Sequence, residues 1–171
     1  MKLVVGLGNP GEKFKMNRHN VGKVFVREFG DVGGFRVFET NCFMNESGRW
    51  VAEKMKEIWG RDWSSSANLS NLVIVHDDLD LPLGQFKIQF GVGPKVHNGV
   101  NSIEEALGAK PFGLAQGKDF WRVRIGVDAR KKGEGRREKG EEYVLEDFTK
   151  EEMKVLEEVF PKIREELRKC L

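Results

Sequence analysis

Hydrophobic residues along the chain follow two different periods, and segments with one period alternate with segments of the other. Short runs that are continuously apolar, or apolar at every second position, are typical of strands and occupy residues 2–8, 35–39, 71–84, 84–90 and 120–127. Longer segments with apolar residues three or four positions apart are typical of helices and occupy residues 20–30, 47–60, 97–109 and 149–171. This alternation predicts an α/β fold with three layers, αβα.

Polar residues mark the ends of several of these elements. Thr149 and Glu152 have the spacing of a capping box, so we expect the last helix to begin at this point. Residues 62–71 are mostly polar, and we expect a surface loop there. A chain of 171 residues suits one domain with one core, so a single domain over residues 1–171 is predicted.

The composition places the chain among soluble globular proteins, with 39% hydrophobic and 33% charged residues. The longest apolar runs are far too short to span a membrane, and the N-terminus lacks the features of a signal peptide. We therefore expect a cytoplasmic protein with no membrane partner, and a monomer. Cys42 and Cys170 are too few for a disulfide framework or a cysteine-built zinc site, so both are expected to be reduced thiols.

The net charge of +2 says little about partners, but the distribution of charge says more. Basic residues outnumber acidic ones in the glycine-rich segment 129–140, which has no apolar period. Two interpretations remain open: a solvated loop without a partner, and a loop that contacts a polyanion. For the second interpretation, the phosphate contacts would come from Lys131, Lys132, Arg136 and Arg137.

The first glycine-rich segment has two possible functions. Gly6, Gly8 and Gly11 have the spacing of a dinucleotide-binding loop. However, Pro10 removes a backbone N–H that a pyrophosphate would use, and the acid at the expected distance, Glu28, falls inside a predicted helix. The cofactor hypothesis is therefore disfavoured. The alternative is that the segment which follows supplies a catalytic histidine, His19.

The acidic end of the third predicted strand could suggest a metal site built from His76, Asp77, Asp78 and Asp80. Alternation along a strand would split these side chains between two faces of the sheet, and the sequence has no tight histidine pair to support them. We therefore expect no metal ion. Asparagines at helix entries, together with a histidine and an aspartate, suggest hydrolytic chemistry instead, although there is no G-x-S-x-G nucleophile motif.

A series of segments across nearly the whole chain resembles the bacterial-type peptidyl-tRNA hydrolase family: GLGNPG, RHNVG, FMNESG, HDDLDLPLG, HNGVNSI, FWRVRIGV and YVLEDF, in that order. The resemblance implies a single-domain fold with a mixed, twisted sheet flanked by helices. It implies hydrolysis of the ester that joins a peptide to the terminal ribose of tRNA, which recycles tRNA dropped from ribosomes. The family works without a metal ion, and no cofactor is expected.

The matching positions imply roles for individual residues. His19 resembles the family's catalytic base, and Asp77 resembles the acid that hydrogen-bonds it. Because an ester to a ribose hydroxyl has a better leaving group than an amide, water activated by a general base suffices. The residues expected to bind the peptide and the CCA end are Asn9, Phe14, Asn20, Met44, Asn45 and Asn98. Lys87 and Lys95 are expected to contact tRNA together with the basic segment.

This chain also departs from the family pattern. Phe14 stands where a tyrosine is usual, and Asn17 stands where a threonine is usual. Residues 94–96, Pro-Lys-Val, replace flexible positions before HNG, and the segment between His19 and Asn45 is short. These departures bear on one wall of the peptide groove and on the mobility of the loop before HNG.

Two other functions stay open at this point. One is a non-enzymatic RNA-binding protein of the same fold, which the presence of His19 and Asp77 disfavours. The other is a nucleotide-dependent enzyme that uses the glycine-rich loop. Turnover of a peptidyl-tRNA distinguishes the first from an enzyme, and retention of NAD or ATP on purification would support the second.

Overall fold

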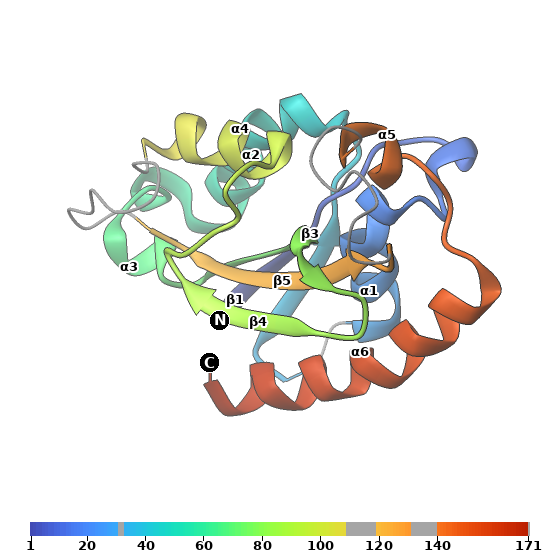
Figure 1. Ribbon diagram of the computed structural model, residues 1–171. Coiled ribbons are helices and arrows are strands. Elements are labelled where there is room, and N and C mark those ends of the chain that lie inside the picture. Colours follow the sequence, from blue (N-terminus) through green and yellow to red (C-terminus); the bar gives the residue numbers. More distant parts are fainter. Residues whose placement is uncertain (31–32, 109–118, 131–139, 171) are drawn as a thin grey trace.

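A five-stranded mixed sheet forms the centre of the computed structural model, which describes residues 1–30, 33–108, 119–130 and 140–170 (Figure 1). The strand order is β2-β1-β3-β5-β4. Only β4 runs antiparallel to its neighbour; the other pairs are parallel. The strands are β1 (Lys2–Gly6), β2 (Phe35–Glu39), β3 (Leu72–Pro82), β4 (Phe86–Phe90) and β5 (Trp121–Asp128).

Helices cover both faces of this sheet and make the three predicted layers. In Figure 1, α6 lies below the sheet and α2, α3 and α4 lie above it. The α-helices are α1 (Val21–Phe29), α2 (Ser47–Trp59), α3 (Ser66–Leu69), α4 (Asn98–Leu107), α5 (Gly140–Val144) and α6 (Lys150–Cys170). Short 3₁₀ helices are η1 (Glu12–Phe14), η2 (Arg18–Asn20), η3 (Met44–Glu46) and η4 (Gly60–Asp62). The predicted α/β fold with a mixed sheet is therefore confirmed.

The strand periods correspond to two hydrophobic cores, one on each face of the sheet. In β3, Val73 and Val75 pack with α1 and α6, whereas Leu72 and Ile74 pack with α2 and α4. All four side chains are fully buried. Since successive side chains of a strand point to opposite faces, a continuously apolar run is what a strand buried on both faces requires.

Two local predictions have different outcomes. The capping box at α6 is confirmed: the backbone N–H of Thr149 donates to Glu152 Oε2 at 2.7 Å, and the backbone N–H of Glu152 donates to Thr149 Oγ1 at 3.2 Å. The prediction of a polar surface loop over residues 62–71 is wrong in part, because the segment contains α3 and fully buries Leu69. Ser65 caps α3 by accepting from the backbone N–H of Asn68 at 3.3 Å, so one apolar residue and one cap suffice to order this stretch.

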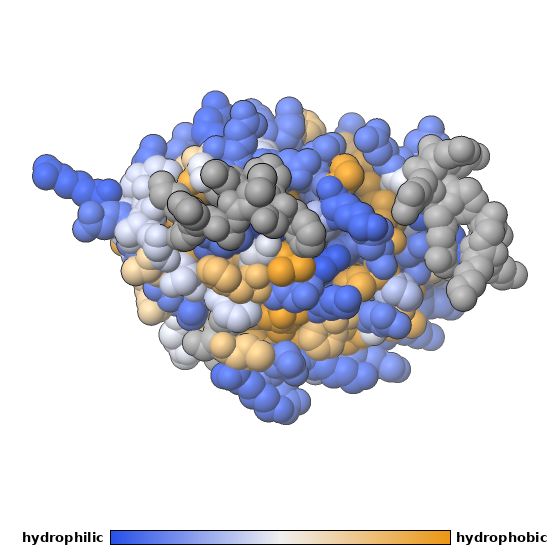
Figure 2. Space-filling model, turned by 60° about the vertical axis from the view of Figure 1, so that its left-hand side comes forward, coloured by the Kyte–Doolittle hydropathy of each residue, from blue (hydrophilic) through white to orange (hydrophobic). Residues whose placement is uncertain are grey.

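Membrane insertion would require a long apolar helix. Within the described ranges, none of the helices combines the length and the apolar character needed to cross a bilayer. One face of the molecule is largely hydrophilic, with hydrophobic residues gathered mainly in its middle (Figure 2).

Candidate active site

The candidate site lies where β3 extends beyond its pairing with β1. The β1 register ends at Val75, so the next residues of β3 emerge at the carboxyl end of the sheet. Functional groups of α/β sheets gather at such an edge. Asp77, which is 3% exposed, comes from this part of β3. Its Oδ1 lies 2.8 Å from Nδ1 of His19, which η2 brings to the same place.

A buried arginine fixes the η2 segment next to His19. Nη2 of Arg18 donates to both carboxylate oxygens of Glu152, at 2.9 and 2.8 Å. Its guanidinium also lies over the ring of Tyr143, 4.2 Å from the centroid. Bidentate arginine–carboxylate pairs set orientation as well as distance. Arg18 therefore ties His19 to the start of α6 and to α5.

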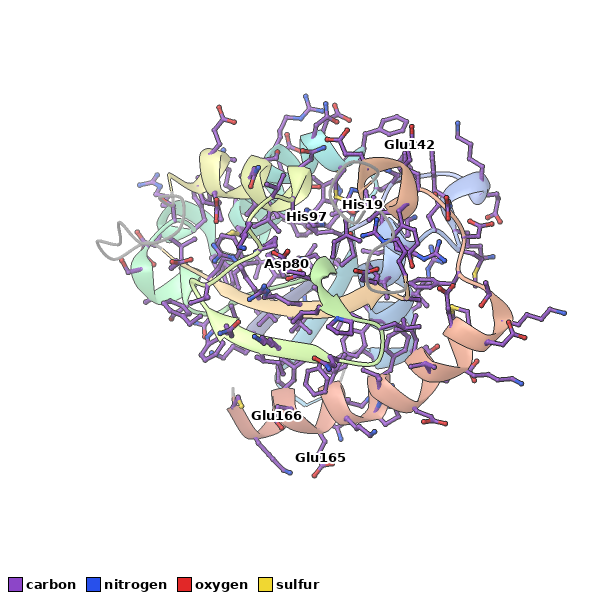
Figure 3. All side chains as sticks on the ribbon, in the orientation of Figure 1. His19, Asp80, His97, Glu142, Glu165 and Glu166 are labelled. Atoms are coloured by element: carbon purple, nitrogen blue, oxygen red, sulfur yellow. The ribbon has the colours of Figure 1, made fainter. Side chains whose placement is uncertain are left out.

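The structure adds a second histidine that sequence reasoning did not select. Nε2 of His97 lies 2.9 Å from the same Oδ1 of Asp77. Figure 3 shows His19 and His97 side by side above the sheet, with ring centroids 5.0 Å apart. The family resemblance draws attention only to the asparagine of HNG. The signal that could have pointed to His97 is its place immediately before a predicted helix, which is the N-cap position.

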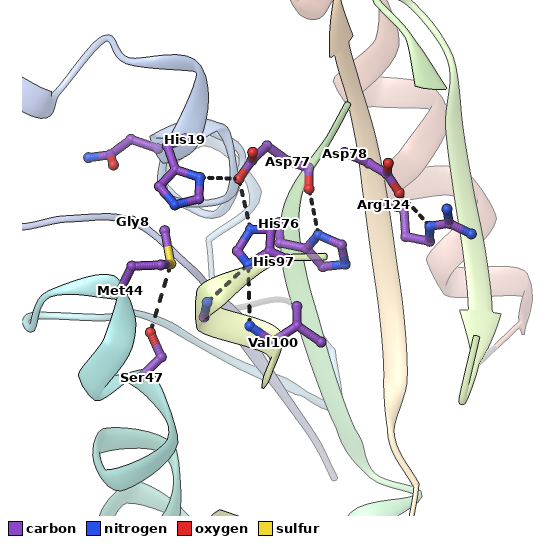
Figure 4. A network of polar contacts seen from close by, with 12 residues as sticks. Gly8, His19, Met44, Ser47, His76, Asp77, Asp78, His97, Val100 and Arg124 are labelled. Atoms are coloured by element: carbon purple, nitrogen blue, oxygen red, sulfur yellow. Dashed lines mark hydrogen bonds and ion pairs between the residues drawn. The ribbon is translucent and has the colours of Figure 1, made fainter. Parts of the chain in front are cut away.

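The cap also fixes the proton on His97. Its Nδ1 accepts hydrogen bonds from the backbone N–H groups of Gly99 at 3.1 Å and Val100 at 3.2 Å. Neutral imidazole has one donor and one acceptor nitrogen. Nδ1 is the acceptor, so Nε2 carries the proton and donates to Asp77. His97 thus joins the start of α4 to the carboxylate (Figure 4).

Asp77 is therefore an ionised carboxylate between two imidazoles. Burial alone would raise its pKa, but the attraction and hydrogen bonds of His19 and His97 hold the pKa of Asp77 well below its usual range. Burial opposes the charged form of His19, yet the nearby Asp77 carboxylate raises the pKa of His19 above its ordinary value. In neutral His19, Nδ1–H donates to Asp77, and Nε2 is left as a base.

A third histidine supports this arrangement from below. His76 is fully buried, and its ring stands edge-on to that of His97, with centroids 4.9 Å apart. Nδ1–H of His76 donates to the backbone carbonyl of Asp77 at 2.7 Å. Burial and the neighbouring His97 lower the pKa of His76 well below its usual value, so this ring is neutral and packs against His97.

The donor chemistry bears on the metal hypothesis. The acids of β3 are divided between two faces, as alternation predicted: Asp77 meets the histidines, whereas Asp78 Oδ2 accepts from Nε of Arg124 at 2.6 Å. Ligand atoms of His19, Asp77 and His97 do lie within 4.8 Å of one another. A metal on Nε2 of His97 would require the proton to move to Nδ1, where two backbone N–H groups already donate. The observed network therefore opposes metal ligation.

The asparagine Asn9 joins three segments of the site. Its Oδ1 accepts from the backbone N–H of Met44 at 2.9 Å. Its backbone N–H donates to Oδ1 of Asn20 at 2.8 Å, and Nδ2 of Asn20 donates back to the Asn9 carbonyl at 2.9 Å. Asn9, Asn20 and Met44 are thus brought together, with Asn20 holding the Asn9 backbone in place.

The glycines of the first loop serve close packing. A Cβ at Gly6 would collide with the backbone of Gly22, and a Cβ at Gly8 would lie 2.8 Å from Cγ of Asn20. These glycines allow β1 and its loop to approach α1. This accounts for them without a dinucleotide.

The other predicted residues occupy different places. Asn45 and Asn98 are exposed, and the two segments are linked because Ser102 Oγ on α4 donates to the Asn45 carbonyl at 2.8 Å. Phe14 is half-buried in η1, with Nζ of Lys13 4.7 Å from its ring centroid. Lys87 and Lys95 line one cavity of about 540 Å³. The segment that contains Lys131, Lys132, Arg136 and Arg137 lies outside the described residues.

Comparisons with known proteins agree on one family. A sequence model described as peptidyl-tRNA hydrolase matches residues 3–37 and 30–171. The peptidyl-tRNA hydrolase of Geobacter sp. (strain M21) is 33% identical over 181 residues, covering 92% of this chain and 85% of the relative. That of Mycobacterium marinum is 36% identical over 172 residues, covering 88% and 80%. The crystal structure of peptidyl-tRNA hydrolase from Acinetobacter baumannii has the same fold, with a TM-score of 0.77 and 24% identity, over 98% of this chain and 87% of that chain.

Proposed function

The chain belongs to the peptidyl-tRNA hydrolase family, and we propose that it cleaves the ester between a peptide, or an N-blocked amino acid, and the terminal ribose of tRNA. The observation that carries the proposed chemistry is the 2.8 Å contact between His19 Nδ1 and Asp77 Oδ1. In this proposal His19 is the general base. Turnover of an N-blocked aminoacyl-tRNA by the purified protein is the direct test; binding without turnover would instead favour the RNA-binding alternative.

The reaction proceeds by attack of water on the ester carbonyl. Nε2 of His19 takes a proton from the water as its oxygen bonds to the carbonyl carbon. Asp77 keeps the other ring nitrogen protonated and stabilises the imidazolium that forms. The bond to the ribose oxygen then breaks, and the imidazolium returns its proton to that oxygen. His97 donates to Asp77 throughout and so holds the carboxylate in position.

The asparagines supply hydrogen bonds to the substrate. Asn98 is exposed at the first turn of α4, where it can orient the water or donate to the developing oxyanion. The amides of Asn9 and Asn45 can each donate and accept. They can therefore bind the peptide backbone, whose N–H and C=O groups are present in every sequence. Met44, Asn20 and Phe14 complete the proposed substrate site.

The nucleic acid is held apart from the chemistry in this proposal. Lys87 and Lys95 are both exposed and line the same cavity beside the segment that leads to His97. Phosphate contacts there would position the CCA end and the acceptor stem without reading bases. The protein would act as a cytoplasmic monomer that recycles tRNA dropped from ribosomes.

Hydrolysis is expected to need no metal ion. In the proposed mechanism the base is Nε2 of His19, and the proton on His97 Nε2 opposes a metal at Asp77. Dialysis against EDTA should therefore leave kcat unchanged when the tRNA is refolded beforehand. Loss of turnover on chelation, with recovery on adding a divalent ion to the protein, would contradict this prediction.

Neutralising the basic segment is expected to weaken tRNA binding and leave chemistry intact. The variant replaces Lys131, Lys132, Arg136 and Arg137 by glutamine. For every phosphate that the variant no longer binds, the log–log salt dependence of binding should flatten by about 0.7–0.9. We expect a higher KM, a flatter salt slope and an unchanged kcat.

A matched control removes the same charge elsewhere. Four exposed basic residues on α6 can be replaced together: Lys154, Lys162, Arg168 and Lys169. Their removal changes net charge equally but should leave the salt slope close to that of the unmodified protein. Equal slopes for both quadruple variants would mean that the basic segment makes no specific contact with tRNA.

A further inference from the structure

A cluster of three side chains crosses the sheet beneath the loop 91–97, which joins β4 to α4. Arg124 on β5 donates through Nε to Asp78 Oδ2 on β3 at 2.6 Å, and through Nη1 to Gln89 Oε1 on β4 at 2.8 Å. The Arg124 side chain is 10% exposed and that of Asp78 is 1% exposed. The strand on each side of β5 thus holds the guanidinium. We call Asp78, Gln89 and Arg124 the Arg124 cluster.

The loop rests directly on this guanidinium. A Cβ at Gly93 would lie 2.5 Å from Cζ of Arg124 and 2.7 Å from its Nη1. Gly93 also has φ +66°, a conformation that favours glycine. Only a residue without a side chain allows the backbone to approach so closely. Four positions later the loop ends at His97, the cap of α4 and a hydrogen-bond donor to Asp77.

Adjacent residues of β3 therefore reach the same segment by two routes. Asp77 holds His97 directly, on one side of the strand, whereas Asp78 on the other side holds Arg124, on which the loop rests (Figure 4). Without the second support, the loop would keep its attachment to His97 but lose the surface that sets its approach.

We propose that Arg124 is a positioning residue: with Asp78 and Gln89 it supports the loop 91–97 and so places His97 against Asp77 and Asn98 in the site. The inference rests on the proposed roles of Asp77 and His97 in hydrolysis. Arg124 also lines the cavity with Lys87 and Lys95, so a role as a phosphate ligand is the alternative that experiments must separate.

The first experiment compares two substrates with and without an acceptor stem. N-acetyl-aminoacyl-tRNA contains the stem phosphates, and the same ester on the trinucleotide CCA does not. For Arg124→Gln, kcat/KM should fall by a similar factor on both substrates, about 10–100-fold, because small displacements of catalytic groups have effects of this size. The salt slope with tRNA should stay unchanged. A decrease confined to tRNA, with a flatter slope, would overturn the proposal in favour of phosphate binding, and unchanged kinetics on both substrates would also overturn it.

The second experiment is a double-mutant cycle between the loop and the guanidinium. Gly93→Ala should slow turnover less in the Arg124→Gln background, because the group that the new Cβ would meet is gone. Gly91→Ala is the matched control. Gly91 has a similar φ, +65°, but a Cβ there would meet Asp119 instead, 2.7 Å from Cγ. Its effect should be the same in both backgrounds. Equal effects of Gly93→Ala in both backgrounds would overturn the proposal.

A third measurement is independent of activity. The chain has only three histidines, so ¹⁵N-histidine labelling resolves each ring by NMR. Arg124→Gln should shift or broaden the Nε2–H signal of His97 and leave that of His76 Nδ1–H unchanged; an unchanged His97 signal would overturn the proposal. If the unmodified protein lacks turnover, the proposed function fails, but the NMR result still tests the positioning role. Since removing one charge of a buried pair can prevent folding, Asp78→Asn/Arg124→Gln, which removes both charges and the guanidinium, should give the same shift.

Discussion

Replacing His19 by alanine is expected to lower kcat by about 10²–10⁴-fold, the contribution of a positioned general base. Binding of tRNA should survive, because the proposed phosphate contacts lie on Lys87, Lys95 and the basic segment. Nε2 of His19 is the basic nitrogen that the Asp77 hydrogen bond leaves free. His97 cannot take its place, since Nδ1 of His97 accepts two backbone hydrogen bonds and Nε2 carries a proton.

The measurement is single-turnover hydrolysis of N-acetyl-aminoacyl-tRNA, with tRNA affinity determined separately. Lys154→Ala, an exposed change on α6, serves as the control and should have the unmodified rate. Turnover of His19→Ala at that same rate would refute the assignment of His19 as the base. A decrease in tRNA affinity large enough to explain the rate would place His19 in binding instead.

Replacing Asp77 by asparagine should lower kcat by about 10²-fold or more, with little change in the free energy of unfolding. Both imidazoles donate to Oδ1 of Asp77, so the amide oxygen of asparagine can keep both hydrogen bonds. It lacks the negative charge, however, and so cannot stabilise the imidazolium that forms on His19. The predicted defect is therefore one of chemistry and not of structure.

The pH–rate profile gives this prediction a sign. Hydrolysis needs neutral His19, so the rate falls as pH drops through the pKa of His19. The Asp77 carboxylate raises that pKa, so Asp77→Asn should move the acidic limb to lower pH while lowering the plateau. Asp80→Asn is the matched control, because Asp80 is an exposed carboxylate on the same strand. If Asp77→Asn leaves both limb and plateau unchanged, Asp77 is not the partner of His19.

Much of the fold could be predicted from periodicity. The alternating and continuously apolar runs correspond to β1 through β5, because burial on one or both faces of a sheet dictates which positions are apolar. Residues 62–71 show where this reasoning fails. Leu69 is one apolar residue among polar ones, and only its position over the sheet made it part of the core.

Periodicity and the order of the motifs were enough to predict the elements, the residue types available for hydrolysis and the family. Which polar groups meet depends on the packing of distant segments: Asp77 contacts His19 and His97, which are 58 and 20 positions away in the chain, and Asp78 contacts Arg124, 46 positions away. Hydrogen bonds depend on distances of a few tenths of an ångström. Such distances are set by the packing of η2, α4 and β5 around β3. A proton on His97 Nε2, and with it the difference between a cap, a metal ligand and a base, follows from that packing alone.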